Sequence, residues 1–260
     1  MEQLVIINII LILIIVGLLI LFKKVCKTDK SKYILLLILP LITIVCHYSS
    51  LVYHQIKSAG AMDFLINNPN LVLPIYPCNV VMWLALVYGI IKNKQTKFSM
   101  FLADYIFWFG MVSAFVGMTV NIDFFNNPTL LDYDVTKGLL AHATMLLNVL
   151  TLSVLGFIKI RLEKNLLHIL ISIIMMFVIG LYCNLLITVI GSEEFAYNVN
   201  SMFLIHSPFE AVPYLTYPLI SLVAFLLYFI THAKSFQDGV RCKIVQILLI
   251  GFVTFFIRFF

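Results

Sequence analysis

The sequence predicts an all-α fold, a polytopic bundle of transmembrane helices. Of the 260 residues, 62% are hydrophobic and only 11% are charged, and the mean hydropathy is +1.07. The apolar residues form runs long enough to cross the hydrocarbon core, which takes about 20 helical residues. Lipid offers no partner to an unpaired backbone group, and the runs lack period-two alternation. Helices are therefore expected rather than a barrel.

Seven spans are expected, and an eighth is left open. The first follows an acidic start at Glu2 and exceeds the usual length of a signal-peptide core, so we expect it to be retained. The last is doubtful because it barely reaches across a bilayer. The chain is expected to form a single transmembrane domain, 1–260. Its expected spans are Leu4–Phe22, Tyr33–Tyr53, Leu71–Ile91, Phe98–Val120, Thr136–Ile158, Asn165–Ile190, Val212–His232 and the shorter Ile244–Ile257.

Basic residues gather in alternate loops of the chain. Of the 17 Lys and Arg residues, 14 lie in four such loops, and the other three are Lys57, Lys137 and Arg258. Because positively charged loops stay in the cytoplasm, the N-terminus is expected on the extracytoplasmic side of the cell membrane. The basic loops would face anionic lipid head groups, which accounts for the net charge of +5. No nucleic-acid partner is expected.

Cys78 is the strongest candidate nucleophile. Pro74 and Pro77 precede it, and because proline disfavours a helical residue before it, a helix is expected to begin near Pro77. Cys78 would then occupy the first turn, where free N–H groups and the helix dipole favour a thiolate. Apolar burial opposes that effect, so a nearby base is required. The alternative is a small packing residue, which is how we interpret Cys46 and Cys183.

His142 is the candidate base. Its span enters from the same side as that of Cys78, and both side chains are expected about 10 Å below the outer interface. Gly138 lies one turn above His142 on the same face, where a neighbouring helix or a substrate has room to approach. Taken alone, an intramembrane histidine is equally well explained by an interhelical hydrogen bond. Nucleophile and base must also come within about 3 Å.

Other polar residues lie in the same half of the bundle. His47, Ser50 and His54 align on one face of the second span, and Asn184 and Thr188 are one turn apart on the sixth. For each of them packing and interfacial hydrogen bonding are favoured over catalysis. His47 is the preferred residue for supporting the catalytic pair.

Four short motifs occur in a particular order along the chain. They are Leu73-Pro-Ile-Tyr-Pro-Cys78-Asn, Ile106-Phe-Trp-Phe-Gly110, Leu139-Leu-Ala-His142-Ala and Asn200-Ser-Met-Phe-Leu204. From about Leu71 to about Pro213 the chain resembles the YwaF-like, transmembrane protein 164-type acyltransferases. It departs from that pattern at Ser201, where relatives often have Tyr, and at Pro77 directly before the cysteine.

The resemblance implies a ping-pong acyl transfer between lipids, with Cys78 and His142 as the catalytic pair and with neither cofactor nor metal. A membrane phospholipid would acylate Cys78, and a lysolipid or ether lipid would receive the acyl group. Acyl-coenzyme A is cytoplasmic, whereas the pair is expected towards the extracytoplasmic leaflet, so it is not the expected donor. Candidates for oxyanion stabilisation or for supporting the pair are Asn79, His47, Asn184 and Asn200.

Two other functions remain open at this point. A seven-span zinc-dependent lipid hydrolase needs histidines at tetrahedral spacing, but no His-x-x-x-His occurs, and His47 and His54 are about 10 Å apart along a helix axis. A non-enzymatic lipid transporter typically has paired charges, broken helices or an internal repeat. Only Pro74 and Pro77 resemble such a break. The sequence does not predict the oligomeric state.

Overall fold

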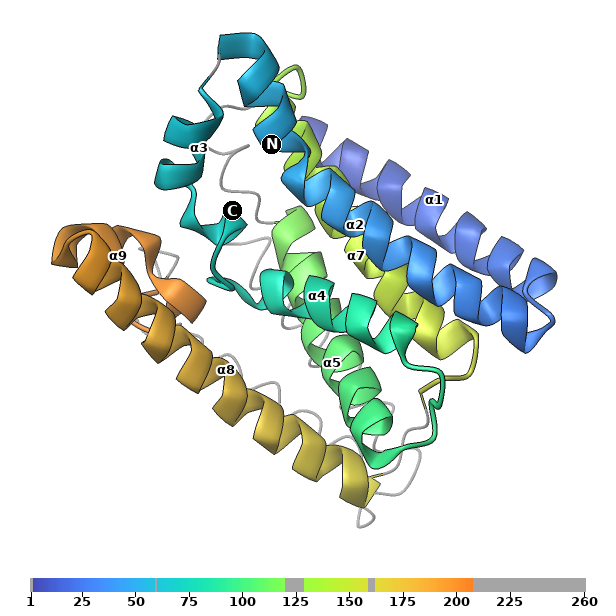
Figure 1. Ribbon diagram of the computed structural model, residues 1–260. Helices are drawn as coiled ribbons and strands as arrows, with labels where there is room; N and C mark the ends of the chain where they lie inside the picture. Colours follow the sequence, from blue (N-terminus) through green and yellow to red (C-terminus); the bar gives the residue numbers. More distant parts are fainter. Residues whose placement is uncertain (1, 59, 120–128, 159–161, 208–260) are drawn as a thin grey trace. The chain divides into compact units, whose positions relative to one another are not determined.

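The computed structural model describes residues 2–58, 60–119, 129–158 and 162–207 (Figure 1). Over these residues the protein has eight α-helices, two short 3-10 helices and no strand, which confirms the all-α prediction. The chain divides into two compact units, Met1–Lys159 and Ile160–Phe260, and each is described by itself. The expected spans 212–232 and 244–257 lie outside the described residues.

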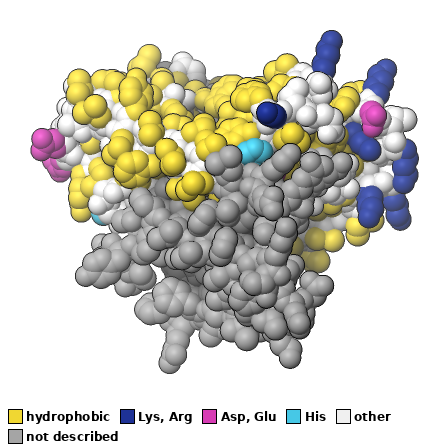
Figure 2. All heavy atoms as spheres, turned by 90° about the horizontal axis from the view of Figure 1, so that it is seen from below, with side chains coloured by type: hydrophobic (Ala, Val, Ile, Leu, Met, Phe, Trp, Pro, Cys, Tyr) yellow, Lys and Arg dark blue, Asp and Glu magenta, His cyan; other side chains and the backbone are white. Residues whose placement is uncertain are grey.

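Among the residues that the structure describes, five helices are long and apolar enough to cross a membrane. Their lipid-facing character shows in large apolar side chains that are exposed, such as Leu13 (66%) and Val45 (67%). Figure 2 shows apolar side chains over most of the described surface in that view, with Lys and Arg side chains gathered at one edge. The five helices are α1 (Glu2–Val25), α2 (Asp29–Ser58), α5 (Lys97–Thr119), α7 (Tyr133–Val154) and α8 (Leu162–Ile190).

The third expected span contains a helix that begins at Pro77, as the two prolines predict, and is therefore shorter than the apolar run Leu71–Ile91. Helix α4 (Pro77–Ile90) has 14 residues and begins after an extended N-cap, Tyr76. It begins at Pro77 because a missing N–H costs nothing at the first helical position. Residues 72–76 are not helical, and a single 3-10 turn, η1 (Pro69–Leu71), precedes them. The helix is about 21 Å long, which is less than the hydrocarbon thickness of about 30 Å.

Two short helices lie in segments that the sequence assigns to loops. They are α3 (Ala61–Asn67) and α9 (Glu193–Val199). Helix α9 begins at Ser192, whose hydroxyl accepts a hydrogen bond from the backbone N–H of Phe195. Each helix has seven residues, which is too short for hydropathy to distinguish it from a polar loop.

The first unit is held together at close approaches between helices. Helix α2 packs on α4 and α7, α5 packs on α4 and α7, and α1 lies against α7. A Cβ at Gly89 of α4 would lie 2.6 Å from the backbone oxygen of Leu36 on α2. A Cβ at Gly110 of α5 would lie 2.9 Å from Val81 and 2.6 Å from Val149. Glycine therefore lets these backbones approach closely, as is typical of membrane helices.

Lys94 closes the C-terminal end of α4. Its ammonium group donates hydrogen bonds to the backbone oxygens of Tyr88 and Gly89 and lies 4.2 Å from the centre of the Tyr88 ring. It thereby satisfies carbonyls that have no partner inside the helix. The residue is only 6% exposed. Burial lowers the pKa of Lys94 from 10.5 to about 8.

This pKa predicts a pH dependence of stability. Between pH 8 and 10.5 the folded protein has released the Lys94 proton that the unfolded chain retains, so stability should rise with pH. The contribution is at most about 3 kcal/mol, since the carbonyl and ring contacts favour the charged form. The melting temperature of the wild type relative to Lys94→Met should therefore increase over this window. The exposed neighbour Lys92 supplies the control, Lys92→Met. A constant difference between wild type and Lys94→Met would contradict the lowered pKa.

Candidate functional site

The first turn of α4 places the Cys78 thiol among hydrogen-bond donors. Cys78 is the second residue of the helix and is half-buried. The backbone N–H groups of Cys78 and Asn79 lie in this turn, and that of Asn79 donates to the backbone oxygen of Tyr76 at 3.0 Å. The side-chain oxygen of Asn79 accepts a hydrogen bond from the backbone N–H of Tyr76 at 3.0 Å, which fixes the turn. Donors in this position stabilise negative charge on a sulfur or on an adjacent oxyanion.

Asn79 also connects this turn to α2. Its Nδ2 lies 3.4 Å from Nε2 of His47, and the backbone carbonyl of Asn70 interacts with the same imidazole. When Nδ2 donates to Nε2, the proton of a neutral His47 ring must be on Nδ1. The structure thus brings together two of the residues that the sequence proposes for supporting the catalytic pair.

His142 has one ring nitrogen fixed and one free to act as a base. Its Nδ1 donates to the backbone oxygen of Gly138 at 2.8 Å, which leaves the lone pair of a neutral imidazole on Nε2. The ring lies against α5 at Gly117, where an added Cβ would overlap Nε2 and Cδ2. His142 is half-buried. Gly138 was expected to leave room for a neighbour, whereas here its backbone oxygen is the partner of Nδ1. Gly117, which lies two turns after Gly110, was not among the residues that the sequence singled out.

The contacts also give the directions of the helices that carry Cys78 and His142. Helix α4 is antiparallel to α2, because Asn79 lies near His47 and Gly89 near Leu36. Helix α7 is antiparallel to α2 as well, because His54 pairs with Asp134 and Tyr33 lies near Phe157, just after α7. The equal depth of Cys78 and His142 in the membrane stays a prediction.

No hydrogen bond among the described residues joins Cys78 to His142. The two imidazoles, His47 and His142, are close enough to interact electrostatically. Polar groups on three helices therefore lead from Cys78 through Asn79 and His47 to His142. For a proton to pass from the sulfur to the His142 imidazole, a substrate or a water molecule would have to lie between them.

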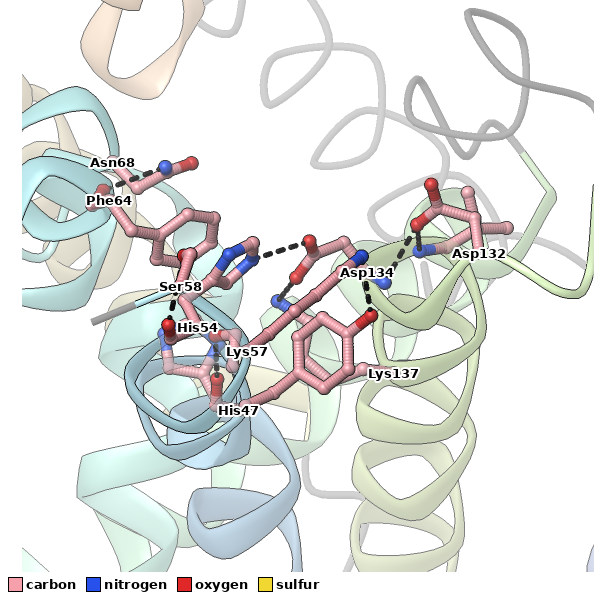
Figure 3. Close-up of polar contacts among 12 residues, drawn as sticks. His47, His54, Lys57, Ser58, Phe64, Asn68, Asp132, Asp134 and Lys137 are labelled. Atoms are coloured by element: carbon pink, nitrogen blue, oxygen red, sulfur yellow. Dashed lines mark hydrogen bonds and ion pairs between the residues drawn. The ribbon is translucent and has the colours of Figure 1, made fainter. Parts of the chain in front are cut away.

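A second polar cluster joins the ends of α2 and α7 (Figure 3). Nε2 of His54 lies 2.9 Å from Oδ2 of Asp134, and Phe64 of α3 stacks on the His54 ring at 3.9 Å. Asp132 caps α7 by accepting hydrogen bonds from the N–H groups of Asp134 and Val135. The sequence placed His54 on the His47 face but did not identify Asp134 as its partner. The His54–Asp134 contact thereby sets the distance between α2 and α7 at the ends of these helices nearest to His47 and His142.

Asn184 and Asn200 have structural contacts within the second unit. The amide of Asn184 donates to the backbone oxygen of Ser201 at 3.2 Å and accepts from its N–H at 2.8 Å. Asn200 ends α9 in the left-handed conformation, with φ of 48°, and its side chain bonds the backbone of Ile205 and His206. The amide of Asn184 holds this turn on α8, the amide of Asn200 closes the turn on itself, and a catalytic role for either stays a prediction.

Within the described ranges, no group of three or more His, Cys, Asp or Glu side chains is arranged to hold a metal ion. No protein-family model, curated protein or solved structure matches this chain. The function must therefore be argued from the chemistry of the residues around Cys78 and His142.

Proposed function

We propose that this protein is an integral-membrane acyltransferase that moves a fatty acyl chain between membrane phospholipids through a thioester on Cys78. The observation that carries the proposal is the position of Cys78 in the first turn of α4, where the helix dipole favours negative charge on its sulfur. The orientation of His142, whose Nε2 lone pair is free, supports it. The order of motifs shared with the YwaF-like, transmembrane protein 164-type acyltransferases agrees with this chemistry.

In the first half-reaction Nε2 of His142 takes the Cys78 thiol proton, through one bridging water, because no hydrogen bond joins the two groups within the described part of the chain. The thiolate attacks an ester carbonyl of a phospholipid. The carbon–oxygen bond to glycerol then breaks, and the leaving oxygen takes the proton from His142. The products are an acyl thioester and a lysolipid.

In the second half-reaction the hydroxyl of a lysolipid or ether lipid gives its proton to His142 and attacks the thioester. The carbon–sulfur bond breaks, and the thiolate recovers the proton. Asn79 is the donor that we assign to the oxyanion in both steps. Its Nδ2 carries two hydrogens, of which one points to His47, so the other is available next to the sulfur. We place the site towards the extracytoplasmic leaflet of the cell membrane, following the distribution of basic loops.

Intact-mass analysis after incubation with phospholipid tests the covalent step. We expect the wild type to gain the mass of one acyl chain, and hydroxylamine to remove it, because a thioester is cleaved by this nucleophile. Cys78→Ala should show no adduct, and His142→Ala should acylate about 10² to 10⁴ times more slowly. Cys46→Ala, another half-buried cysteine, is the matched control and should acylate normally. Lipid remodelling that persists in Cys78→Ala would overturn the mechanism.

A further inference from the structure

Lys57 and Lys137 are two of the three basic residues outside the four basic loops, and the structure brings them to the same polar cluster (Figure 3). Lys57 is exposed and donates to the hydroxyl of Tyr53 at 3.0 Å. The side chain of Lys137 is only 15% exposed, lies 3.8 Å from Asp134 and interacts electrostatically with His142. A largely covered lysine away from the basic loops needs an explanation that lipid anchoring does not give.

The ion pair of Lys137 is incompletely satisfied. Its Nζ lies 3.8 Å from Oδ1 of Asp134, which is too long for a hydrogen bond, and it makes no hydrogen bond within the described part of the chain. Oδ1 of Asp134 is itself buried without a hydrogen-bond partner. The reason is that His54 holds the other carboxylate oxygen at 2.9 Å and keeps Asp134 turned away. Buried polar groups are almost always paired, so the three donors of this ammonium call for a ligand with acceptor oxygens.

The position of Lys137 suggests which ligand this is. Lys137 lies five residues before His142 on α7, about 7.5 Å nearer the entrance, and it interacts electrostatically with both His142 and His47. A glycerophospholipid has a comparable spacing of groups, with the phosphate at the membrane surface and the ester a few ångströms deeper.

We propose that Lys137, oriented by the His54–Asp134 pair, binds the phosphodiester of the substrate phospholipid. This proposal rests on the acyltransferase function and specifies its substrate site. The ammonium donates to the non-bridging phosphate oxygens, which match it in charge. The ester below the phosphate then reaches the level of His142 and Cys78.

The test measures lipid binding by the full-length Cys78→Ala protein in detergent micelles, so it does not depend on thioester formation. The ligands are dioleoylphosphatidylcholine, dioleoylglycerol with the same acyl chains but no phosphate, and inorganic phosphate. Lys137→Gln should weaken phosphatidylcholine binding about tenfold or more and leave dioleoylglycerol binding unchanged. Lys57→Gln, the matched control at an exposed lysine of the same cluster, should change neither.

Equal losses for both lipids in Lys137→Gln, or no loss for either, would overturn the proposal. Stabilisation by inorganic phosphate without binding of phosphatidylcholine would also overturn it, since the site would then take a free anion. If Lys137→Gln does not fold, the double variant Lys137→Gln with Asp134→Asn removes both charges and should show the same loss for phosphatidylcholine alone. Absence of the Cys78 thioester in the wild type would refute the transferase and leave this binding result standing.

Discussion

Replacing Gly117 with alanine should reduce acyl transfer by about 100-fold or more and destabilise the protein by about 1 to 3 kcal/mol. The new methyl group would overlap Nε2 and Cδ2 of His142. The ring has no free direction in which to retreat, because Nδ1 is bonded to the backbone oxygen of Gly138. Either the imidazole leaves its position or α5 moves away from α7. Thermal unfolding and the rate of acyl transfer measure the two effects.

Two variants separate the His142 contact from a general effect of alanine on a membrane helix. Gly17→Ala is the matched control, because a Cβ at Gly17 meets nothing within 4 Å, and it should change neither stability nor activity. In the double variant Gly117→Ala with His142→Ala the clash is absent. Its melting temperature should return to that of His142→Ala, while activity stays low. A Gly117→Ala protein with the stability and activity of the wild type would show that the ring does not depend on this glycine.

The sequence predicts most of the long helices because their signal is local. Twenty consecutive apolar residues can do little else in a membrane, and α1, α2, α5, α7 and α8 follow from that fact. The beginning of α4 is also local, since Pro77 fits the first helical position but not the middle of a helix. The same prolines make α4 shorter than its apolar run, which hydropathy does not register.

The pairing of polar side chains is not predictable in this way. His54 and Asp134 are 80 residues apart, and their contact depends on α2 being the neighbour of α7. The surfaces of apolar helices are chemically alike, so hydropathy does not show which helices are neighbours. Gly117 illustrates the same limit, because its role is evident only when the His142 ring is placed against it. Sequence could thus propose Cys78 and His142, but not the side chains and glycines that surround them.

The structure adds detail to the interpretation of Asn79. The sequence makes it a candidate for oxyanion stabilisation because it follows the cysteine. In the structure it is 4% exposed, its oxygen fixes the turn at Tyr76 and its nitrogen faces His47. The buried position and the use of both ends of the amide make it the residue on which the geometry around the thiol depends.

Asn79→Leu should therefore lower the rate constant for acylation of Cys78 by about 10² to 10³ and change the KM little, because the oxyanion forms only in the transition state. Stability should fall by about 1 kcal/mol through loss of the bond to Tyr76. Single-turnover acylation, followed by intact mass, separates the rate constant from lipid binding. Thermal unfolding gives the loss of stability independently.

The matched comparison is His47→Phe, which removes the partner of Nδ2 but leaves the bond between Asn79 and Tyr76 in place. If Asn79 supplies the oxyanion donor, this variant should acylate within about tenfold of the wild type, since both hydrogens of Nδ2 remain next to the sulfur. A loss as large as that of Asn79→Leu would mean that His47 itself acts on the thiol. His47, rather than His142, would then be the nearer base, because only His47 contacts the turn that carries Cys78.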